Sequence, residues 1–304
     1  MELLWFTIEL RLRLISEGGL VRWLGPALRG LLNGRFKALA CQFPSDVRDR
    51  DWVHCKGCPH LTTCPYGSVF EAEPAEGVRL APGATEVPRP AWLAPSFPLP
   101  ARAVVGAEIP VVLHLVGETA IAQRQGIVAS LVDCGRTPGI GPDHIRFDVR
   151  FGRESRGVLR SDALPPTSDA LAGILPRVGI GLTAPFVPRR VAASDVPTFA
   201  ELFRSAFCTV RDLFAAHATA IPGEYRELME AAQSVSMIDH CFEPFEQERW
   251  SNRSKDHYAI RGWVGGGIYA DVPMSLLPWM IWGGRFHSGS YRAFGAGGWR
   301  IILD

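Results

Sequence analysis

The last segment of the chain combines residue types that bind phosphate and unpaired bases. Residues 286–300 contain four glycines, two arginines, a histidine and four aromatic residues. Glycine lets a backbone approach a ligand closely, an arginine guanidinium matches the geometry of phosphate, and aromatic faces stack on unpaired bases. A plain β-hairpin tip is the commoner use of a glycine-rich segment, but a tip needs neither the histidine nor the arginines. The segment is therefore a candidate binding loop that leads into a final strand.

Four of the seven cysteines form a cluster that offers the ligands of a metal site. They are Cys41, Cys55, Cys58 and Cys64, and the middle pair has Cys-x-x-Cys spacing. Four thiolates close a tetrahedral zinc site, and they equally hold an iron–sulfur cluster. In a cytosolic chain such clustering favours a metal over disulfides. We expect a structural zinc ion here, with an iron–sulfur cluster and unligated thiols as the alternatives.

The composition is that of a globular protein. Of 304 residues, 47% are hydrophobic and 21% are charged, and the length is sufficient for two domains with separate cores. No run approaches the roughly 20 apolar residues that a membrane span needs. Because Glu2, Arg11 and Arg13 are not typical of a signal peptide, we expect a cytoplasmic protein. The net charge of +1 does not identify a partner, but from Arg249 onward seven basic residues face three acidic ones.

Hydrophobic periodicity predicts alternating strands and helices along the whole chain. The first half has a four-cysteine insertion and a proline-rich connector, and the second half has a continuous helical pattern rich in phenylalanine. The predicted strands are 5–15, 109–116, 145–151, 174–187, 242–250 and 258–269. The predicted helices are 21–40, 120–132, 197–219, 225–235 and 274–281. A polar stretch over 152–169 is the expected domain boundary, and the predicted class is α+β, with two such domains in tandem.

The order of these motifs resembles a known family. The resemblance rests on three groups of residues: Cys64-Pro65-Tyr66 with Phe70-Glu71, then Trp250-Ser251-Asn252-Arg253-Ser254, then the terminal His-x-Gly and Phe-Gly-x-Gly. Over essentially its whole length the chain resembles the CRISPR-associated endoribonucleases of the RAMP superfamily, which process precursor CRISPR RNA in antiviral defence.

The resemblance implies two tandem ferredoxin-like (RRM-like) domains. The first covers 1–165, with a four-cysteine insertion at 41–71 and a proline-rich connector at 73–103. The second covers 170–304, with a glycine-rich RNA-binding loop at 284–300. Where relatives often carry Lys-Gly in this loop, the chain has Ser290-Tyr291, so one cation is lost and Arg292 is the candidate substitute.

The resemblance also implies a metal-independent cut within the CRISPR repeat. A 2′-hydroxyl attacks the neighbouring phosphate and leaves a 2′,3′-cyclic phosphate and a 5′-hydroxyl. The reaction needs a general base, a general acid and a cation beside the phosphate. The implied partners are the CRISPR repeat RNA and other subunits of a CRISPR effector complex.

The candidate site residues follow from these roles. The catalytic candidates are His287, His54, Tyr66 and Arg253. The RNA-binding candidates are Arg22, Arg29, Lys37, Arg253, Lys255, Arg285, Gly289, Tyr291, Arg292, Gly295 and Gly297. Competing roles are packing for His287, a link to the metal site for His54, and a solvated hairpin tip for Arg253 and Lys255.

Two other classes of function remain open at this point. A catalytically inactive RAMP subunit that binds guide RNA and scaffolds an effector complex has the same loop and arginines. A redox enzyme with a metal or cluster uses a glycine-rich segment for a nucleotide. Against the redox enzyme, these glycines precede a strand rather than opening a helix, so the phosphate-binding helix terminus is missing.

Overall fold

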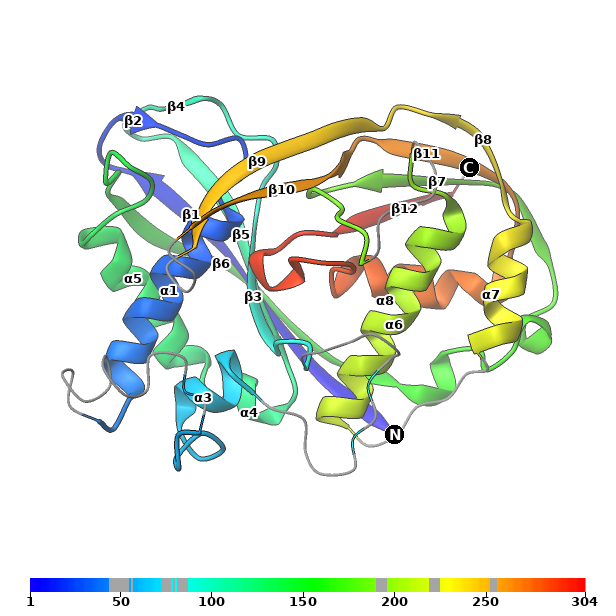
Figure 1. The fold of residues 1–304 in the computed structure, drawn as a ribbon, viewed down its shortest axis with the longest axis horizontal. Helices are drawn as coiled ribbons and strands as arrows, with labels where there is room; N and C mark the ends of the chain where they lie inside the picture. Colours follow the sequence, from blue (N-terminus) through cyan, green and yellow to red (C-terminus); the bar gives the residue numbers. More distant parts are fainter. Residues whose placement is uncertain are drawn as a thin grey trace. The chain divides into compact units, whose positions relative to one another are not determined.

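The computed structural model describes residues 1–43, 55, 57–72, 78, 80, 87–189, 196–218, 225–251 and 256–303. They belong to two compact units (Figure 1). The N-terminal unit lies within Leu4–Val78 and Thr85–Val158, and the C-terminal unit contains Leu159 onward together with Met1–Leu3. The division between Val158 and Leu159 falls inside the polar stretch 152–169.

The N-terminal unit is built on a four-stranded sheet in the order β3-β5-β1-β6. The strands are β1 (Glu2–Leu14), β3 (Ala91–Pro95), β5 (Glu108–Val116) and β6 (Phe147–Arg160), and the main helices are α1 (Gly25–Ala40) and α5 (Arg124–Arg136). Strand β5 pairs antiparallel with both β1 and β3. Along the chain the order is β-α-β-β-α-β, and this sheet order is that of the ferredoxin-like fold.

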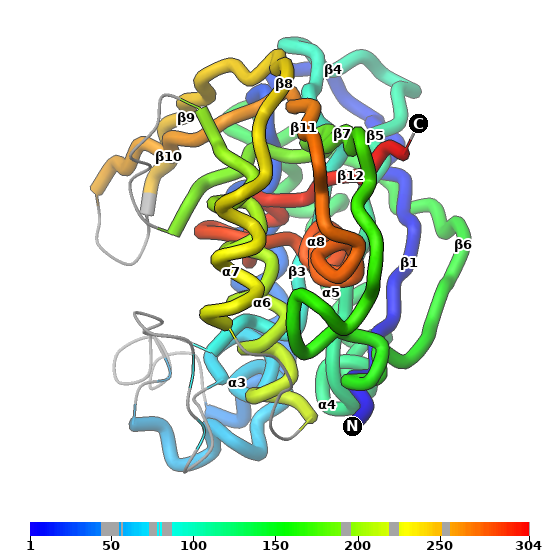
Figure 2. The backbone as a smooth tube through the Cα atoms, turned by 90° about the vertical axis from the view of Figure 1, so that its right-hand side faces the viewer, coloured from blue at the N-terminus to red at the C-terminus, as the bar shows by residue number. Residues whose placement is uncertain are grey.

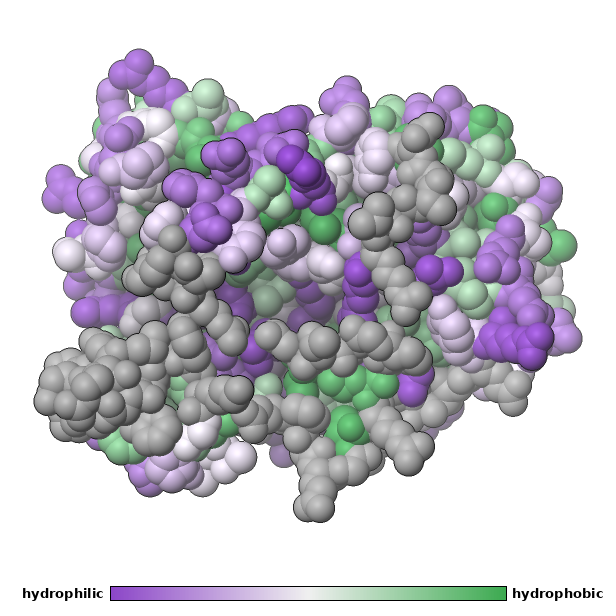
Figure 3. Space-filling model, viewed as in Figure 1, coloured by the Kyte–Doolittle hydropathy of each residue, from purple (hydrophilic) through white to green (hydrophobic). Residues whose placement is uncertain are grey.

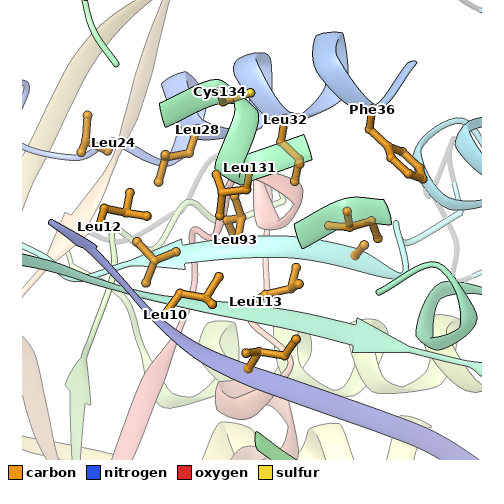
Figure 4. Packing of buried hydrophobic residues seen from close by; sticks show 14 of the residues in the cluster. Leu10, Leu12, Leu24, Leu28, Leu32, Phe36, Leu93, Leu113, Leu131 and Cys134 are labelled. Carbon is orange, nitrogen blue, oxygen red and sulfur yellow. The ribbon is translucent and has the colours of Figure 1, made fainter. Parts of the chain in front are cut away.

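Alternation along β1 explains how this unit forms its core. From Ile8 to Leu14 every second side chain is buried, because successive strand residues point to opposite faces. Helix α1 turns Leu28, Leu32 and Phe36 toward that face at a spacing of four residues. Figure 4 shows Leu28 and Leu32 directed at the leucines of the sheet. The ring of Phe36 packs against those of Tyr66 and Phe70. Each fully buried leucine contributes roughly 2 kcal/mol.

The C-terminal unit repeats the same order of strands, β12-β7-β11-β8. The strands are β7 (Ile174–Leu182), β8 (Ser236–His240), β11 (Gly266–Pro273) and β12 (Trp299–Leu303), and the helices are α6 (Phe199–His217), α7 (Tyr225–Ser234) and α8 (Leu277–Arg285). A two-stranded ribbon, β9 (Glu243–Ser251) and β10 (Asp256–Val264), is inserted between β8 and β11. Figure 2 shows the ribbon extending beyond the sheet.

Helix α6 provides much of the C-terminal core. It begins with a capping box in which Thr198 and Glu201 satisfy each other's backbone donors. Its buried face is rich in phenylalanine, and the ring of Phe207 lies 4.6 Å from that of Trp279 on α8. The indole of Trp279 donates to the carbonyl of Pro165, so its polar atom is satisfied in the core.

The structure corrects several predicted elements. Part of the connector 73–103 is strand β3, in which Trp92 stacks on His114 of β5 at 4.7 Å, because a short apolar run between prolines pairs with the sheet edge. Residues 258–269 are two strands, since Gly265 adopts φ +95° between β10 and β11. Helix 120–132 is divided into α4 (Glu118–Ala122) and α5, and β8 was not predicted.

The remaining elements are short. They are β2 (Gly18–Gly19), β4 (Arg102–Ala103), α3 (Pro65–Phe70), and the 3₁₀ turns η1 (Ser161–Ala163), η2 (Ser168–Ala170), η3 (Met274–Leu276) and η4 (Arg292–Phe294). Figure 3 shows one face of the molecule, on which hydrophilic residues gather over β9 and β10. Within the described ranges, no helix is long and apolar enough to cross a membrane.

Candidate nucleic-acid interface

Residues 286–298, the terminal loop, connect α8 to β12 and are held by residues 183–189, the supporting segment. Backbone hydrogen bonds join the two along their length. They run from Thr183 N to Gly298 O (2.9 Å), from Gly297 N to Pro185 O (2.8 Å) and from Ser290 N to Val187 O (2.7 Å). The supporting segment also pairs with the ribbon, since Phe186 forms a bridge with Trp263. The loop is therefore bound to a fixed frame.

Three glycines that were predicted to bind RNA have conformations that other residues rarely adopt. Gly289, Gly295 and Gly297 have φ values of +94°, +81° and +78°. A Cβ atom on Gly297 would overlap the carbonyl of Ser288, and one on Gly289 would overlap the carbonyl of Val187. These glycines are therefore required by the shape of the loop, whatever the loop binds.

His287 lies inside the loop. Its side chain is buried, and Nδ1 is 3.0 Å from the carbonyl oxygen of Gly295 and 3.2 Å from that of Ala296. Because both neighbours are acceptors, Nδ1 carries the proton and donates it. Burial, aided by the positive charge of Arg292, lowers the pKa of His287 to about 4, so the ring is neutral at pH 7. This geometry makes the ring a brace for the loop, and its catalytic role stays a prediction.

The burial of His287 predicts a loss of stability in mild acid. In the unfolded chain the imidazole of His287 is protonated below about pH 6.5, whereas in the folded protein it is protonated only below about pH 4. Stability is therefore complete above pH 6.5 and falls as the pH drops through that window. Lowering the pH from 7.5 to 5.5 is expected to reduce the free energy of unfolding by about 1 kcal/mol, which urea unfolding measures.

His287→Gln should remove this pH dependence, whereas His240→Gln, at an exposed histidine of β8, should retain it. A wild-type stability that does not change over this pH range would contradict the assignment of His287 as a buried neutral ring.

Arg292 and Tyr291 occupy different environments in the loop. Arg292 is buried and its Nε donates to the carbonyl of Phe286 at 2.8 Å, so it braces the loop from within. The half-buried ring of Tyr291 stacks on Phe294 with centroids 5.6 Å apart. The guanidinium of Arg249, from β9, lies 4.7 Å over the other ring, that of Phe294. Tyr291, Phe294 and Arg249 thus form a stack of the kind on which bases can extend.

Arg249 and Phe294 were not among the predicted site residues. They belong to a strand and a loop that are far apart in the sequence, and only the packing of the ribbon against the terminal loop brings them together. No local periodicity or motif signals such a contact.

The remaining candidates in the C-terminal unit lie on α8 and the ribbon. Arg285 as a whole residue is exposed at the end of α8, but its guanidinium lies 5.3 Å from the ring centroid of Trp282. Desolvation of the guanidinium lowers the pKa of Arg285. The ribbon exposes about half of the Trp250 side chain, which meets His257 edge to face at 5.0 Å. Arg253 and Lys255 lie outside the described residues.

The candidates in the N-terminal unit lie at α1 and α3. Arg22 precedes α1, which begins at Gly25, and its guanidinium lies 5.4 Å from the ring of Phe97. The helix predicted from residue 21 is thus shorter, and it carries Arg29 and Lys37 as partly buried side chains. The prediction that these three residues bind RNA is not tested by this geometry.

Tyr66, a predicted proton-transfer residue, is buried at the start of α3. Its hydroxyl donates to Oε1 of Glu71 at 3.3 Å, and its ring stacks on Phe70 at 5.6 Å. Burial and the nearby carboxylate raise its pKa well above the ordinary range, so the phenol keeps its proton. His54 lies outside the described residues.

The four predicted metal ligands line a single pocket of the N-terminal unit. Cys41, Cys55, Cys58 and Cys64 share it with His60 and Leu61, and all four thiols are free. Burial raises the pKa of Cys55 to about 11. Among the described residues, no three His, Cys, Asp or Glu side chains are already arranged to hold a metal ion. The donor set matches a tetrathiolate site in chemistry, while the side chains have not converged.

Comparison with known proteins agrees with this architecture. Residues 3–158 match the family model AF_1859_N, described as an N-terminal domain. Because this range is more than half of the chain, the protein belongs to that family. None of the curated proteins matches the sequence significantly.

Solved structures identify the fold more closely. Thermus thermophilus Cas6 superposes with a TM-score of 0.52 and 12% identity over 98% of this chain and 99% of that one. A Cas6 product complex gives 0.54 and 12% over 97% and 100%, and a second one gives 0.51 and 17% over 98% and 99%. The chain thus has the tandem Cas6 fold, and the resemblance predicted from its motifs is confirmed at the level of the fold.

Proposed function

We propose that this protein is an endoribonuclease that cleaves precursor CRISPR RNA within the repeat. This proposal rests mainly on the superposition with the Cas6 product complexes, in which this chain and each Cas6 chain cover each other almost completely. The order of the motifs along the chain supports the same assignment. The cysteine cluster in the first half and the glycine-rich loop near the end occur in the same order as in the nuclease family that the chain resembles.

The proposed reaction is an internal transesterification. The 2′-oxygen attacks the adjacent phosphorus while the bond from phosphorus to the 5′-oxygen breaks. A base takes the 2′-hydroxyl proton and an acid gives a proton to the leaving 5′-oxygen. The products are a 2′,3′-cyclic phosphate and a 5′-hydroxyl, and no metal takes part in the step.

Support for RNA binding comes from the surroundings of the terminal loop. The stack of Tyr291, Phe294 and Arg249 has a half-buried aromatic ring at one end and a guanidinium at the other. Such a stack suits an unpaired base, whose face can extend it, while Arg285 adds an exposed cation on α8. The braced loop holds its shape before RNA arrives, which lowers the ordering cost of binding.

The test is incubation with the protein's own 5′-labelled repeat RNA, both in excess EDTA and without added divalent metal. We expect a single cut that leaves a cyclic phosphate. A repeat with one 2′-deoxynucleotide at the cut position should remain whole, because it lacks the nucleophile. The deoxy substrate separates attack by the 2′-hydroxyl from hydrolysis by an attacking water molecule.

Histidine variants then identify the catalytic group. Loss of a general acid or base lowers the rate by about 10²-fold or more, so His54→Ala is expected to be nearly inactive if this residue is the base. His287→Ala should reduce cleavage together with stability, since the ring braces the loop. His240→Ala, at an exposed histidine, is the matched control and should cleave normally.

An RNA-binding subunit without catalytic activity is the second candidate. It is favoured by the burial of His287, whose Nδ1 is engaged by loop carbonyls. Tight binding of the repeat with no cut by the wild type would establish it. A CRISPR-protein partner is proposed for either function, because the chain also superposes on part of a partial Cas6-RT-Cas1–Cas2 complex, with a TM-score of 0.53 and 9% identity over 100% of this chain and 46% of that one.

A further inference from the structure

The cysteine pocket of the N-terminal unit lies between the ends of two helices. Cys41 directly follows the last residue of α1, and Cys64 directly precedes the first residue of α3. Cys55 and Cys58 come from the chain between them and line the same pocket. Four thiols that are spread over more than twenty residues of sequence therefore face one small volume.

The turn that carries the middle pair is tight. The amide of Cys58 donates to the carbonyl of Cys55 at 3.0 Å, and Gly57 between them has φ +75°. Cys55 itself has φ +55°, which is uncommon for a residue with a side chain. Both cysteines of this Cys-x-x-Cys turn line the pocket. The amide of Cys64 donates to the carbonyl of His60 at 2.7 Å.

Packing alone does not account for the cluster. Leu61 is the buried aliphatic side chain among the described residues from 41 to 64, and Cys41 and Cys58 are only partly buried. Because the described residues of this segment bury so little aliphatic surface, a disulfide or a metal would be a further source of stability. None of the four cysteines forms a disulfide.

We propose that Cys41, Cys55, Cys58 and Cys64 bind one Zn²⁺ ion that ties the end of α1 to the start of α3. Zinc accepts four thiolates in tetrahedral geometry and has no redox chemistry, which suits a structural tie. Because no three of these side chains already stand at coordination positions, the thiols converge when the metal binds and release their protons. The ion takes no part in the proposed RNA cleavage.

The experiment measures the metal itself. The full-length protein is purified from zinc-supplemented cells, and its metal content is determined by mass spectrometry; about one zinc per chain is expected. Cys58→Ser should lose the zinc, and Cys241→Ser, at an exposed cysteine of the C-terminal unit, should retain it. Cobalt added to the apoprotein should give the thiolate charge-transfer and tetrahedral absorption bands, and Cys58→Ser should lack them.

Two outcomes would overturn the proposal. One is a wild-type protein that contains no zinc and gives no cobalt spectrum. The other is iron with acid-labile sulfide and broad visible absorption, which would indicate an iron–sulfur cluster. If Cys58→Ser does not fold, the wild type can be treated with a thiol-modifying reagent instead, and release of its zinc would show that thiolates hold the ion. These readouts do not depend on RNA cleavage, so the two proposals can fail separately.

Discussion

Gly297→Ala is expected to destabilise the C-terminal unit by about 3 kcal/mol and to abolish tight RNA binding. At φ +78° an added side chain is strained by about 1–2 kcal/mol, and its Cβ would also overlap the carbonyl of Ser288, so the backbone must shift. That shift would break the hydrogen bonds that join Ser288 to Gly297 and Gly297 to Pro185. Urea unfolding measures the first effect and titration of labelled repeat RNA measures the second.

The matched control is Gly181→Ala in β7 of the same unit. An added Cβ there meets only Cδ1 of Ile302 at 3.9 Å, which is ordinary van der Waals contact. This variant should fold and bind RNA like the wild type. Gly297→Ala with wild-type stability would show that the loop does not have the conformation described here. Lower stability of Gly297→Ala with unchanged RNA binding would show that binding does not depend on the shape of this loop.

Arg189→Met is expected to lower stability by about 3 kcal/mol, because it removes the cation that faces a buried carboxylate. Nη1 of Arg189 lies 3.1 Å from Oδ2 of Asp212 on α6, and the Asp212 side chain is 1% exposed. Arg189 ends the supporting segment, directly after Val187 and Pro188, whose carbonyls hold Ser290. The same change should therefore weaken RNA binding through the loop. The 31% exposure of Arg189 places the cost at the low end for a buried pair.

A second pair in the same unit provides the control. Arg261 and Glu246 lie 3.2 Å apart on the ribbon, but both side chains are exposed. Arg261→Met should leave the unfolding midpoint unchanged, since exposed ion pairs contribute little. The double variant Arg189→Met/Asp212→Asn should be more stable than Arg189→Met alone, because no buried charge remains. Equal effects of Arg189→Met and Arg261→Met would refute the anchoring role of Arg189.

Most of the regular elements follow directly from the sequence. The alternation over 5–15 corresponds to β1, and the phenylalanine-rich pattern over 197–219 corresponds to α6. In both, one face carries the apolar side chains, so local periodicity is enough. Local periodicity does not predict an element whose formation depends on contacts with segments that are distant in the sequence. Strand β3 lies in a proline-rich stretch and forms because β5 offers an edge, and Gly265 divides one predicted strand into two.

In the candidate site, too, some features follow from the sequence and others depend on the tertiary structure. Residue types alone indicated a glycine-rich loop with phosphate-binding and base-stacking side chains, and a cysteine cluster with metal chemistry. Only the tertiary structure decided which of these side chains point inward. His287 and Arg292 are buried braces, while Arg249 and Phe294 join Tyr291 in a stack that connects the ribbon to the loop. The physical reason is that periodicity and composition act over a few residues, whereas burial and stacking depend on segments that meet only when the sheets form.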